Sequence, residues 1–170
     1  KKHRRRNGGI RLLGLIDQRE VVSATYSELD KGFTELTLDE GASLSKFEFL
    51  EDGAEYRETI AAKDGAPTIA HELTFTLERM DADTAAAIEA IIEASRSGLI
   101  AVVVTINGDA LLLGYSQEFG KERPLRIASA QATTGRLLSE TTSETVTLRS
   151  EDVSKARPLL DDLNNLFSKI

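Results

Sequence analysis

The sequence predicts a mainly β fold of the α+β class, an antiparallel β-sandwich or barrel with one internal helix packed on the sheet and a short C-terminal helix. Roughly eight to ten short apolar or alternating segments are separated by turn residues, and helices do not alternate with them as in an α/β sheet. Only two stretches have helical spacing. With 170 residues and no cysteine, the chain fits one domain whose core forms without disulfides.

The internal helix is expected just after residue 80. Asp81 and Asp83 can each accept a hydrogen bond from a free N–H group at a helix start. Apolar residues then recur at helical spacing as far as Ser95. Gly98 follows, a residue that tolerates a positive φ just past a helix end.

A central hairpin is expected next. Residues 99–106 are apolar and mostly β-branched without a break, which predicts a strand buried on both faces. Asn107-Gly108 then predicts a type I′ turn, because both central positions of that turn need a positive φ. The return strand covers residues 110–115. The helix packed against this hairpin is the predicted nucleus of the fold.

The other strands are predicted from alternating or continuous apolar residues between turn signals. Residues 63–67 have the composition of a loop, since Pro67 cannot donate a hydrogen bond to a ladder. The strands are expected at residues 10–17, 33–38, 46–50, 55–61, 69–77, 125–132 and 144–149, with a short strand or irregular connection at 20–26.

Three parts are predicted along the chain: a flexible basic arm over residues 1–9, a β-sandwich over residues 10–150 and an amphipathic helical extension over residues 151–170. Pro158 suits the first turn of that helix. The apolar side chains after it would either cover the chain's own sheet or dock on another subunit. They are Leu159, Leu163, Leu166, Phe167 and Ile170.

Charge is distributed unevenly. Five basic residues lie in the first six positions, which leaves 16 basic and 28 acidic residues, a net charge of −12, in the rest of the chain. An acidic body argues against broad binding of phosphate groups. The arm can contact nucleic acid, an acidic neighbouring subunit or only solvent. Its basic residues are Lys1, Lys2, Arg4, Arg5 and Arg6.

The sequence contains no recognised motif for catalysis, for a cofactor or for a metal ion. His71 is followed by Glu72, and on a strand these two side chains point to opposite faces. Close acidic pairs are explained by helix caps, turns and solvated faces. We therefore expect a non-enzymatic protein without cofactor or metal. Membrane insertion is not expected either, because no apolar run is long enough for a span.

The order of elements resembles that of bacteriophage tail tube proteins, whose relatives in contractile injection systems have a similar plan. A strand-rich N-terminal half precedes one internal helix, a buried hairpin and two C-terminal strands. Residues 8–17 resemble the opening of tail proteins encoded by phages of Bacteroidetes-type hosts, and so does the hairpin at residues 99–115 followed by Gly135 and residues 145–148. The likeness covers most of residues 8–150. It does not include the basic arm or the helix expected from Pro158.

The resemblance implies a structural subunit of the virion tail, assembled in the host cytoplasm, that forms six-fold rings stacked into a hollow tube for genome delivery. Strands of neighbouring subunits would line one inner barrel, whose acidic wall would let DNA slide. The arm, or a loop at residues 38–46 that includes Asp39, Glu40, Gly41 and Ala42, would bridge successive rings. Leu163, Leu166 and Phe167 are further candidate contacts between subunits.

On this basis the expected partners are other copies of the chain, other tail or connector proteins, and double-stranded DNA that passes without sequence-specific binding. A ring-forming head–tail connector or tail terminator is the nearest alternative. A basic-armed nucleic-acid-associated β-domain is another, and it predicts that removing residues 1–6 abolishes DNA binding. A monomeric β-domain of a bacterial protein also stays open.

Overall fold

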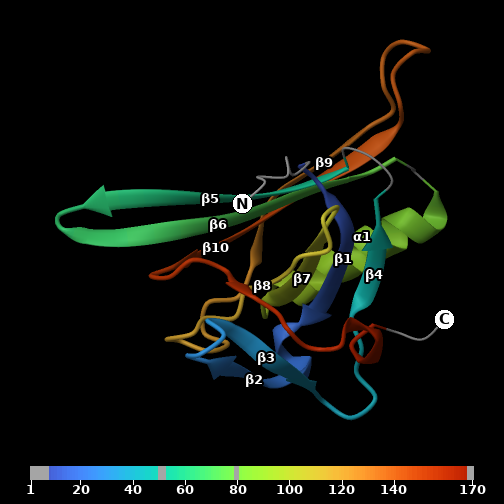
Figure 1. Cartoon of the computed structure of the whole chain (residues 1–170). Helices are drawn as coiled ribbons and strands as arrows, with labels where there is room; N and C mark the ends of the chain where they lie inside the picture. Colours follow the sequence, from blue (N-terminus) through green and yellow to red (C-terminus); the bar gives the residue numbers. More distant parts are fainter. Residues whose placement is uncertain (1–7, 50–52, 79–80, 168–170) are drawn as a thin grey trace, which may run out of the picture.

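The computed structural model describes residues 8–49, 53–78 and 81–167 and shows a β-sandwich with one α-helix (Figure 1). The described strands form three antiparallel sheets, ordered β11-β8-β7-β1-β4, β5-β6-β10-β9 and β2-β3. None of these sheets closes into a barrel within the described part of the chain. The predicted mainly β fold with an internal helix is therefore confirmed, in its sandwich form.

Most predicted strands are confirmed to within a few residues, and the longest ones extend beyond the predicted ends. The strands are β1 (Ile10–Asp17), β2 (Val21–Ser27), β3 (Gly32–Leu38), β4 (Ser45–Glu48), β5 (Ala54–Lys63), β6 (Ala66–Leu77), β7 (Leu99–Thr105), β8 (Ala110–Leu113), β9 (Arg126–Thr133), β10 (Ser143–Asp152) and β11 (Arg157–Pro158). The helices are α1 (Ala82–Ser95) and the 3₁₀ turns η1 (Gln18–Glu20) and η2 (Leu163–Asn165).

Strand β7 lies between two hydrophobic cores. One face contributes Leu99, Ala101 and Val103 to the core enclosed by the two larger sheets and α1. The other face contributes Ile100 and Val102 to a second core under β2 and β3. This arrangement confirms the prediction of a strand buried on both faces, and it explains why the apolar run is not interrupted by polar residues.

Helix α1 begins and ends close to the predicted residues. Asp81 is the N-cap, and its carboxylate accepts a hydrogen bond from the N–H of Thr84 at 2.8 Å. Ile88 and Ile91 point into the first core, which fixes the helix against the sandwich. None of the described helices is long and apolar enough to cross a membrane.

The turn after β7 differs from the predicted type. The hairpin is present, but at this turn only Gly108 has a positive φ, of 90°, and Asn107 does not. The N–H of Gly108 donates to the carbonyl of Thr105, and the N–H of Thr105 donates to the carbonyl of Asp109. The connection is therefore a four-residue loop, and the predicted type I′ turn is wrong.

A two-residue turn of type I′ occurs instead at Asp64-Gly65, where φ is 54° and 80°. The loop predicted at residues 63–67 is therefore wrong, because β5 and β6 continue to this turn. Pro67 stands opposite Ala62, the second pair from the turn. In this geometry that pair is not hydrogen-bonded. The backbone nitrogen of Pro67, which carries no hydrogen, therefore faces the free side of the ribbon, where no ladder bond is lost.

The C-terminal segment is an extended strap (residues 157–167), not the predicted amphipathic helix. Pro158 belongs to β11, which pairs with β8. The N–H of Leu159 donates to the carbonyl of Ala110, and the carbonyl of Leu166 accepts from the N–H of Leu44. These long-range bonds replace helical ones, and Leu159 and Leu166 are buried in the second core. The only helical part described is η2, while Ile170 lies outside the described residues.

Candidate assembly surface

The sheet ordered β5-β6-β10-β9, called here the four-stranded sheet, ends on two strands that each pair on one side only (Figure 1). All its pairings are antiparallel, so β5 and β9 run in opposite directions. A copy rotated about an axis along the strands would therefore place its β9 antiparallel to the β5 of the first copy. The sheet can continue from copy to copy with one type of pairing.

Strand β9 has little of the protection that natural edge strands use. Seven of its eight residues are exposed. A bulge near Ala128 and the charge of Arg126 protect its beginning. Residues 129–133 are uncharged and, apart from Gln131, small, with no proline, lysine or further bulge. This half of the edge is suited to pairing with another strand.

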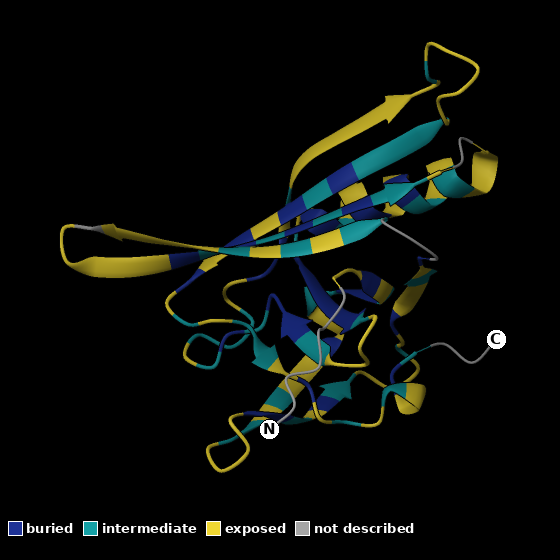
Figure 2. Ribbon diagram, turned by 45° about the horizontal axis from the view of Figure 1, so that its top comes forward, coloured by how far each residue is buried: buried dark blue, intermediate teal, exposed yellow. Residues whose placement is uncertain are grey.

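The β5–β6 hairpin extends beyond the body of the chain (Figure 2). β10 pairs with β6 only as far as Ile69, so the distal part of the hairpin is a two-stranded ribbon. The side chain of Ile60, which stands opposite Ile69 where this ribbon begins, is 64 % exposed. Isolated two-stranded ribbons are marginally stable in water. The ribbon therefore lacks the packing that a neighbouring molecule would supply.

The outward face of the four-stranded sheet is rich in hydroxyl groups and carries charges of both signs. The hydroxyls of Thr74 and Thr147 lie 3.2 Å apart across β6 and β10. Those of Thr76 and Thr145 lie 3.0 Å apart on the same strands. Among the described side chains, the alternation of the strands places charged residues of both signs on this face, namely Glu55, Glu72, Glu151, Arg57 and Arg149. Two ion pairs join Glu55 to Arg57 and Glu151 to Arg149.

Below the inward face, a buried polar cluster fastens the sheet to residues 153–156, which lead to the strap. His71 is 4 % exposed, and its Nε2 lies 2.8 Å from the carbonyl oxygen of Ser154. Glu58, opposite His71, accepts hydrogen bonds from the hydroxyl of Tyr56 and the N–H of Ala156, both at 2.8 Å. Burial, followed by the hydrogen bond to Glu58, raises the pKa of Tyr56. His71 and Glu58 thus both hold the connecting backbone.

Replacing Glu58 by alanine is expected to lower the free energy of unfolding by about 1–3 kcal/mol, because the Tyr56 hydroxyl and the Ala156 N–H lose their acceptor. Urea denaturation followed by circular dichroism measures this loss. The matched control is Glu55→Ala on the same strand, where only an exposed ion pair is lost and a change within about 0.5 kcal/mol is expected. Equal losses in both variants would contradict a fastening role for Glu58.

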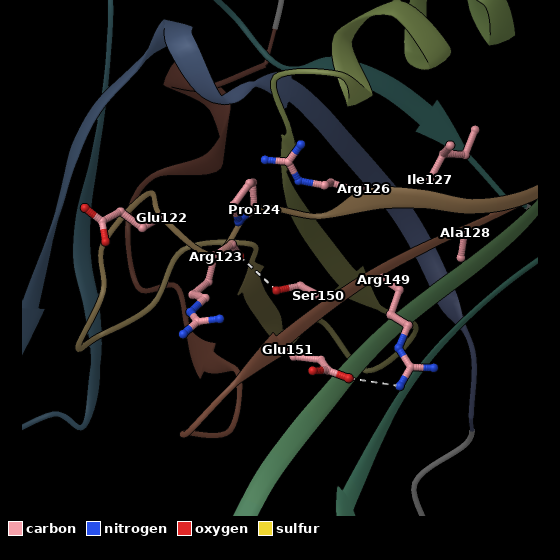
Figure 3. A pocket seen from close by; sticks show the side chains of 9 residues that line it. All are labelled: Glu122, Arg123, Pro124, Arg126, Ile127, Ala128, Arg149, Ser150 and Glu151. Carbon is pink, nitrogen blue, oxygen red and sulfur yellow. Dashed lines mark hydrogen bonds and ion pairs between the residues drawn. The ribbon is translucent and has the colours of Figure 1, made fainter.

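A hollow of about 420 Å³ lies where β9 and β10 meet the preceding loop (Figure 3). Arg123, Arg126 and Arg149 line it, but Figure 3 shows their side chains pointing to different sides. Arg149 is paired with Glu151, and the Ser150 hydroxyl donates to the carbonyl of Arg123 at 2.8 Å. The three guanidinium groups therefore do not converge on one anion.

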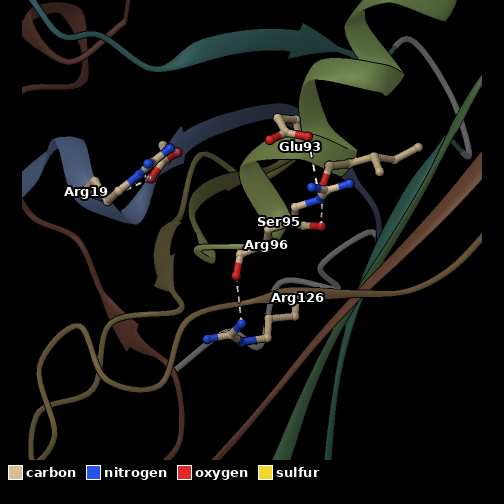
Figure 4. A network of polar contacts seen from close by, with 7 residues as sticks. Arg19, Glu93, Ser95, Arg96 and Arg126 are labelled. Carbon is tan, nitrogen blue, oxygen red and sulfur yellow. Dashed lines mark hydrogen bonds and ion pairs between the residues drawn. The ribbon is translucent and has the colours of Figure 1, made fainter.

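Arg126 has a structural partner at the end of α1 (Figure 4). Its Nη1 donates to the carbonyl of Arg96, the C-cap residue, at 3.0 Å. A cation at this position satisfies a free carbonyl and interacts favourably with the helix dipole. Arg96 in turn pairs with Glu93 at 3.5 Å. The beginning of β9 is thereby fixed to the helix.

The structure places the predicted contact residues in different surroundings. The basic arm, Lys1 to Arg6, lies outside the described residues. Asp39, Glu40 and Gly41 are exposed, and Ala42 packs against the second core. Leu163 and Phe167 pack against that core, and Leu166 is buried in it. Leu163, Leu166 and Phe167 therefore cover the chain's own sheet, which is one of the two roles that the sequence left open.

Sequence reasoning did not identify the free edge of β9 or the exposed ribbon, because neither has a composition that distinguishes it from a paired strand. Among the described residues, no group of three or more His, Cys, Asp or Glu side chains is arranged to hold a metal ion. In comparisons with protein-family models, curated proteins and solved structures, nothing matches this chain.

Proposed function

We propose that this chain is a non-enzymatic structural subunit of a bacteriophage tail tube, which assembles with copies of itself into stacked rings that conduct DNA. The observation that carries the proposal is the four-stranded sheet, all antiparallel, with two free edges of opposite direction. An even number of alternating strands lets identical copies form one continuous antiparallel barrel around an axis. Among assemblies in which identical copies form such a barrel, we choose the tail tube because the order of elements in this chain resembles that of tail tube proteins.

The dimensions of such a ring support the proposal. Six copies of a four-stranded sheet give about 24 strands, and at about 4.8 Å between strands the circumference is about 115 Å. The backbone diameter is then about 37 Å, and strand tilt widens it further. After the side chains are included, this leaves room for a DNA double helix.

In this arrangement the outward face of the four-stranded sheet would form the lumen wall. That wall would be rich in hydroxyl groups and would carry charges of both signs, rather than being acidic as the resemblance suggests. The two arginines on this face, Arg57 and Arg149, are already paired with glutamates. Among the described side chains of this face, no arginine is therefore free to hold a phosphate group, which is compatible with DNA that passes without being bound.

Cysteine cross-linking tests the ring directly, because the native chain contains no cysteine. One cysteine replaces Ser129 on β9, and a second replaces Glu55, Arg57 or Thr59 on β5, all on the outward face. If β5 pairs with β9 of a neighbour, one of these variants places thiols across the new ladder within disulfide distance, about 4.4–6.8 Å between Cα atoms. Mild oxidation should then give a ladder of covalent oligomers ending at the ring size.

The matched controls are the single-cysteine variants, which can form dimers at most. Negative-stain microscopy of concentrated native protein accompanies the assay. Hollow tubes together with a ladder would support the proposal, while rings that do not stack would favour the connector or terminator alternative. A panel that yields dimers only, with monomeric native particles, would overturn the proposed ring.

A further inference from the structure

The turn between β9 and β10 (residues 134–142) stands away from the body of the chain (Figure 2). Two leucines lie in the middle of this turn. Leu137 is 63 % exposed and Leu138 is fully exposed. The carboxylate of Glu140 accepts hydrogen bonds from the backbone N–H groups of Arg136, at 2.5 Å, and Leu137, at 3.3 Å. The pKa of Glu140 is lowered for this reason. The two leucines are thus presented on an ordered turn, called here the leucine tip.

An apolar hollow of about 260 Å³ lies between α1, β1 and the beginning of β4. Buried side chains of Leu15, Ile91 and Leu99 line it. Ala87 and Ala94 of α1 leave the space open, because alanine is the smallest side chain that a helix commonly presents. The volume is below the roughly 300–1,000 Å³ of typical small-molecule sites. Apolar side chains of another chain are therefore a better match for this hollow than a cofactor.

The charges beside the leucine tip and the hollow are complementary. Asp17 and Glu20 are the two acidic residues that line the hollow. Asp17 is paired with Arg19 at 2.9 Å, whereas the carboxylate of Glu20 forms no ion pair with another described residue. Arg136 directly precedes the two leucines, and its guanidinium likewise forms no ion pair within the described part of the chain. Burying an apolar contact next to this pair of opposite charges favours one orientation of docking.

We infer that the leucine tip docks into this hollow of a second copy, with Leu137 and Leu138 filling it and Arg136 paired with Glu20. The tip points away from its own body, so the contact forms between molecules (Figure 1). Tip and hollow are different surfaces, and a contact of this head-to-tail kind builds rings or filaments. The inference rests on the proposed function, to which it adds a second contact between copies besides the pairing of β5 with β9.

A cysteine pair across the proposed contact tests it in the full-length chain. Leu138→Cys is combined with Ala90→Cys, an exposed residue that lines the hollow. The control combines Leu138→Cys with Leu29→Cys, which is exposed on the turn between β2 and β3. We expect about tenfold more covalent oligomer from the first pair, since only docked thiols are held at high effective concentration. Equal yields from the two pairs would overturn the inference.

Charge reversal in the cross-linking background tests the orientation of the docked tip. Arg136→Glu and Glu20→Arg should each lower the yield of covalent oligomer several-fold, because like charges then face each other. Combining both reversals should restore the yield. A combined variant that stays as low as the single variants would show that these two residues do not pair, and would overturn the inferred orientation.

The two cysteine experiments separate the inference from the proposed function. If the β5–β9 pair forms a ladder and the pair at the leucine tip does not, the docking is wrong and the ring survives. If only the pair at the leucine tip forms oligomers, copies associate through the tip, and ring closure through the four-stranded sheet is wrong.

Discussion

Replacing Gly114 by alanine is expected to lower the free energy of unfolding by at least about 3 kcal/mol, the upper end of the usual range for single substitutions. Gly114 follows β8 with a φ of 81°, and a Cβ there would lie 2.6 Å from the carbonyl oxygen of Leu99. It would also lie 3.2 Å from the backbone nitrogen of Leu125. Leu99 and Leu125 are joined by two backbone hydrogen bonds, so neither backbone can retreat without breaking them. Urea denaturation of purified variants measures the loss.

The chain offers a matched control in Gly41, which has a φ of 79° but no atom within 4 Å of an added Cβ. Gly41→Ala should therefore lower the free energy of unfolding by only about 1–2 kcal/mol, because the only penalty is that of a side chain on a residue in the left-handed conformation. The difference between the two variants isolates the steric effect at Gly114. If both variants lose the same stability, the close approach of these backbones is not present in solution.

Phe75→Ala should lower the free energy of unfolding by about 3–5 kcal/mol, because it leaves a cavity in the middle of the sandwich. Phe75 is fully buried, and its ring centroid lies 5.9 Å from that of Phe47 and 6.4 Å from that of Phe49. Its strand, β6, is paired on both sides, so the sheet cannot easily move to fill the space. Thermal and urea denaturation of the variant measure the effect.

Phe119→Ala is the control for this substitution, since Phe119 is half-buried in a loop and packs under the guanidinium of Arg123 at 4.7 Å. Its loss should stay near 1 kcal/mol, in the range of a partly exposed cation–π contact. A loss below about 1.5 kcal/mol for Phe75→Ala would mean that the two sheets do not close around this ring as tightly as core side chains normally pack.

The loop at residues 38–46, a candidate bridge between rings, needs substitutions rather than a deletion. Leu44 is fully buried, and its N–H donates to the carbonyl of Leu166 in the strap. Removing the loop would therefore remove a core residue and release the strap. Glu40, which is exposed, can be changed without disturbing these contacts.

Much of the fold follows from local patterns. The uninterrupted apolar run of β7 predicts burial on both faces because each face of a strand takes every second residue. Asp81 predicts the beginning of α1 because its short carboxylate can reach a free N–H. In each case the physical cause lies within a few residues of the feature, and the sequence contains it.

The tertiary structure decides the features whose partners are distant in the chain. The apolar spacing after Pro158 suits a helix, but hydrogen bonds to Ala110 and Leu44 hold that segment extended. His71 has no neighbour in sequence that explains it, and its partner is the backbone of Ser154. The free edges of β5 and β9 exist only because the sheet order leaves both strands outermost. Local patterns determined the strands and the helix of this protein, whereas long-range pairing determined the surfaces that it can offer to other copies.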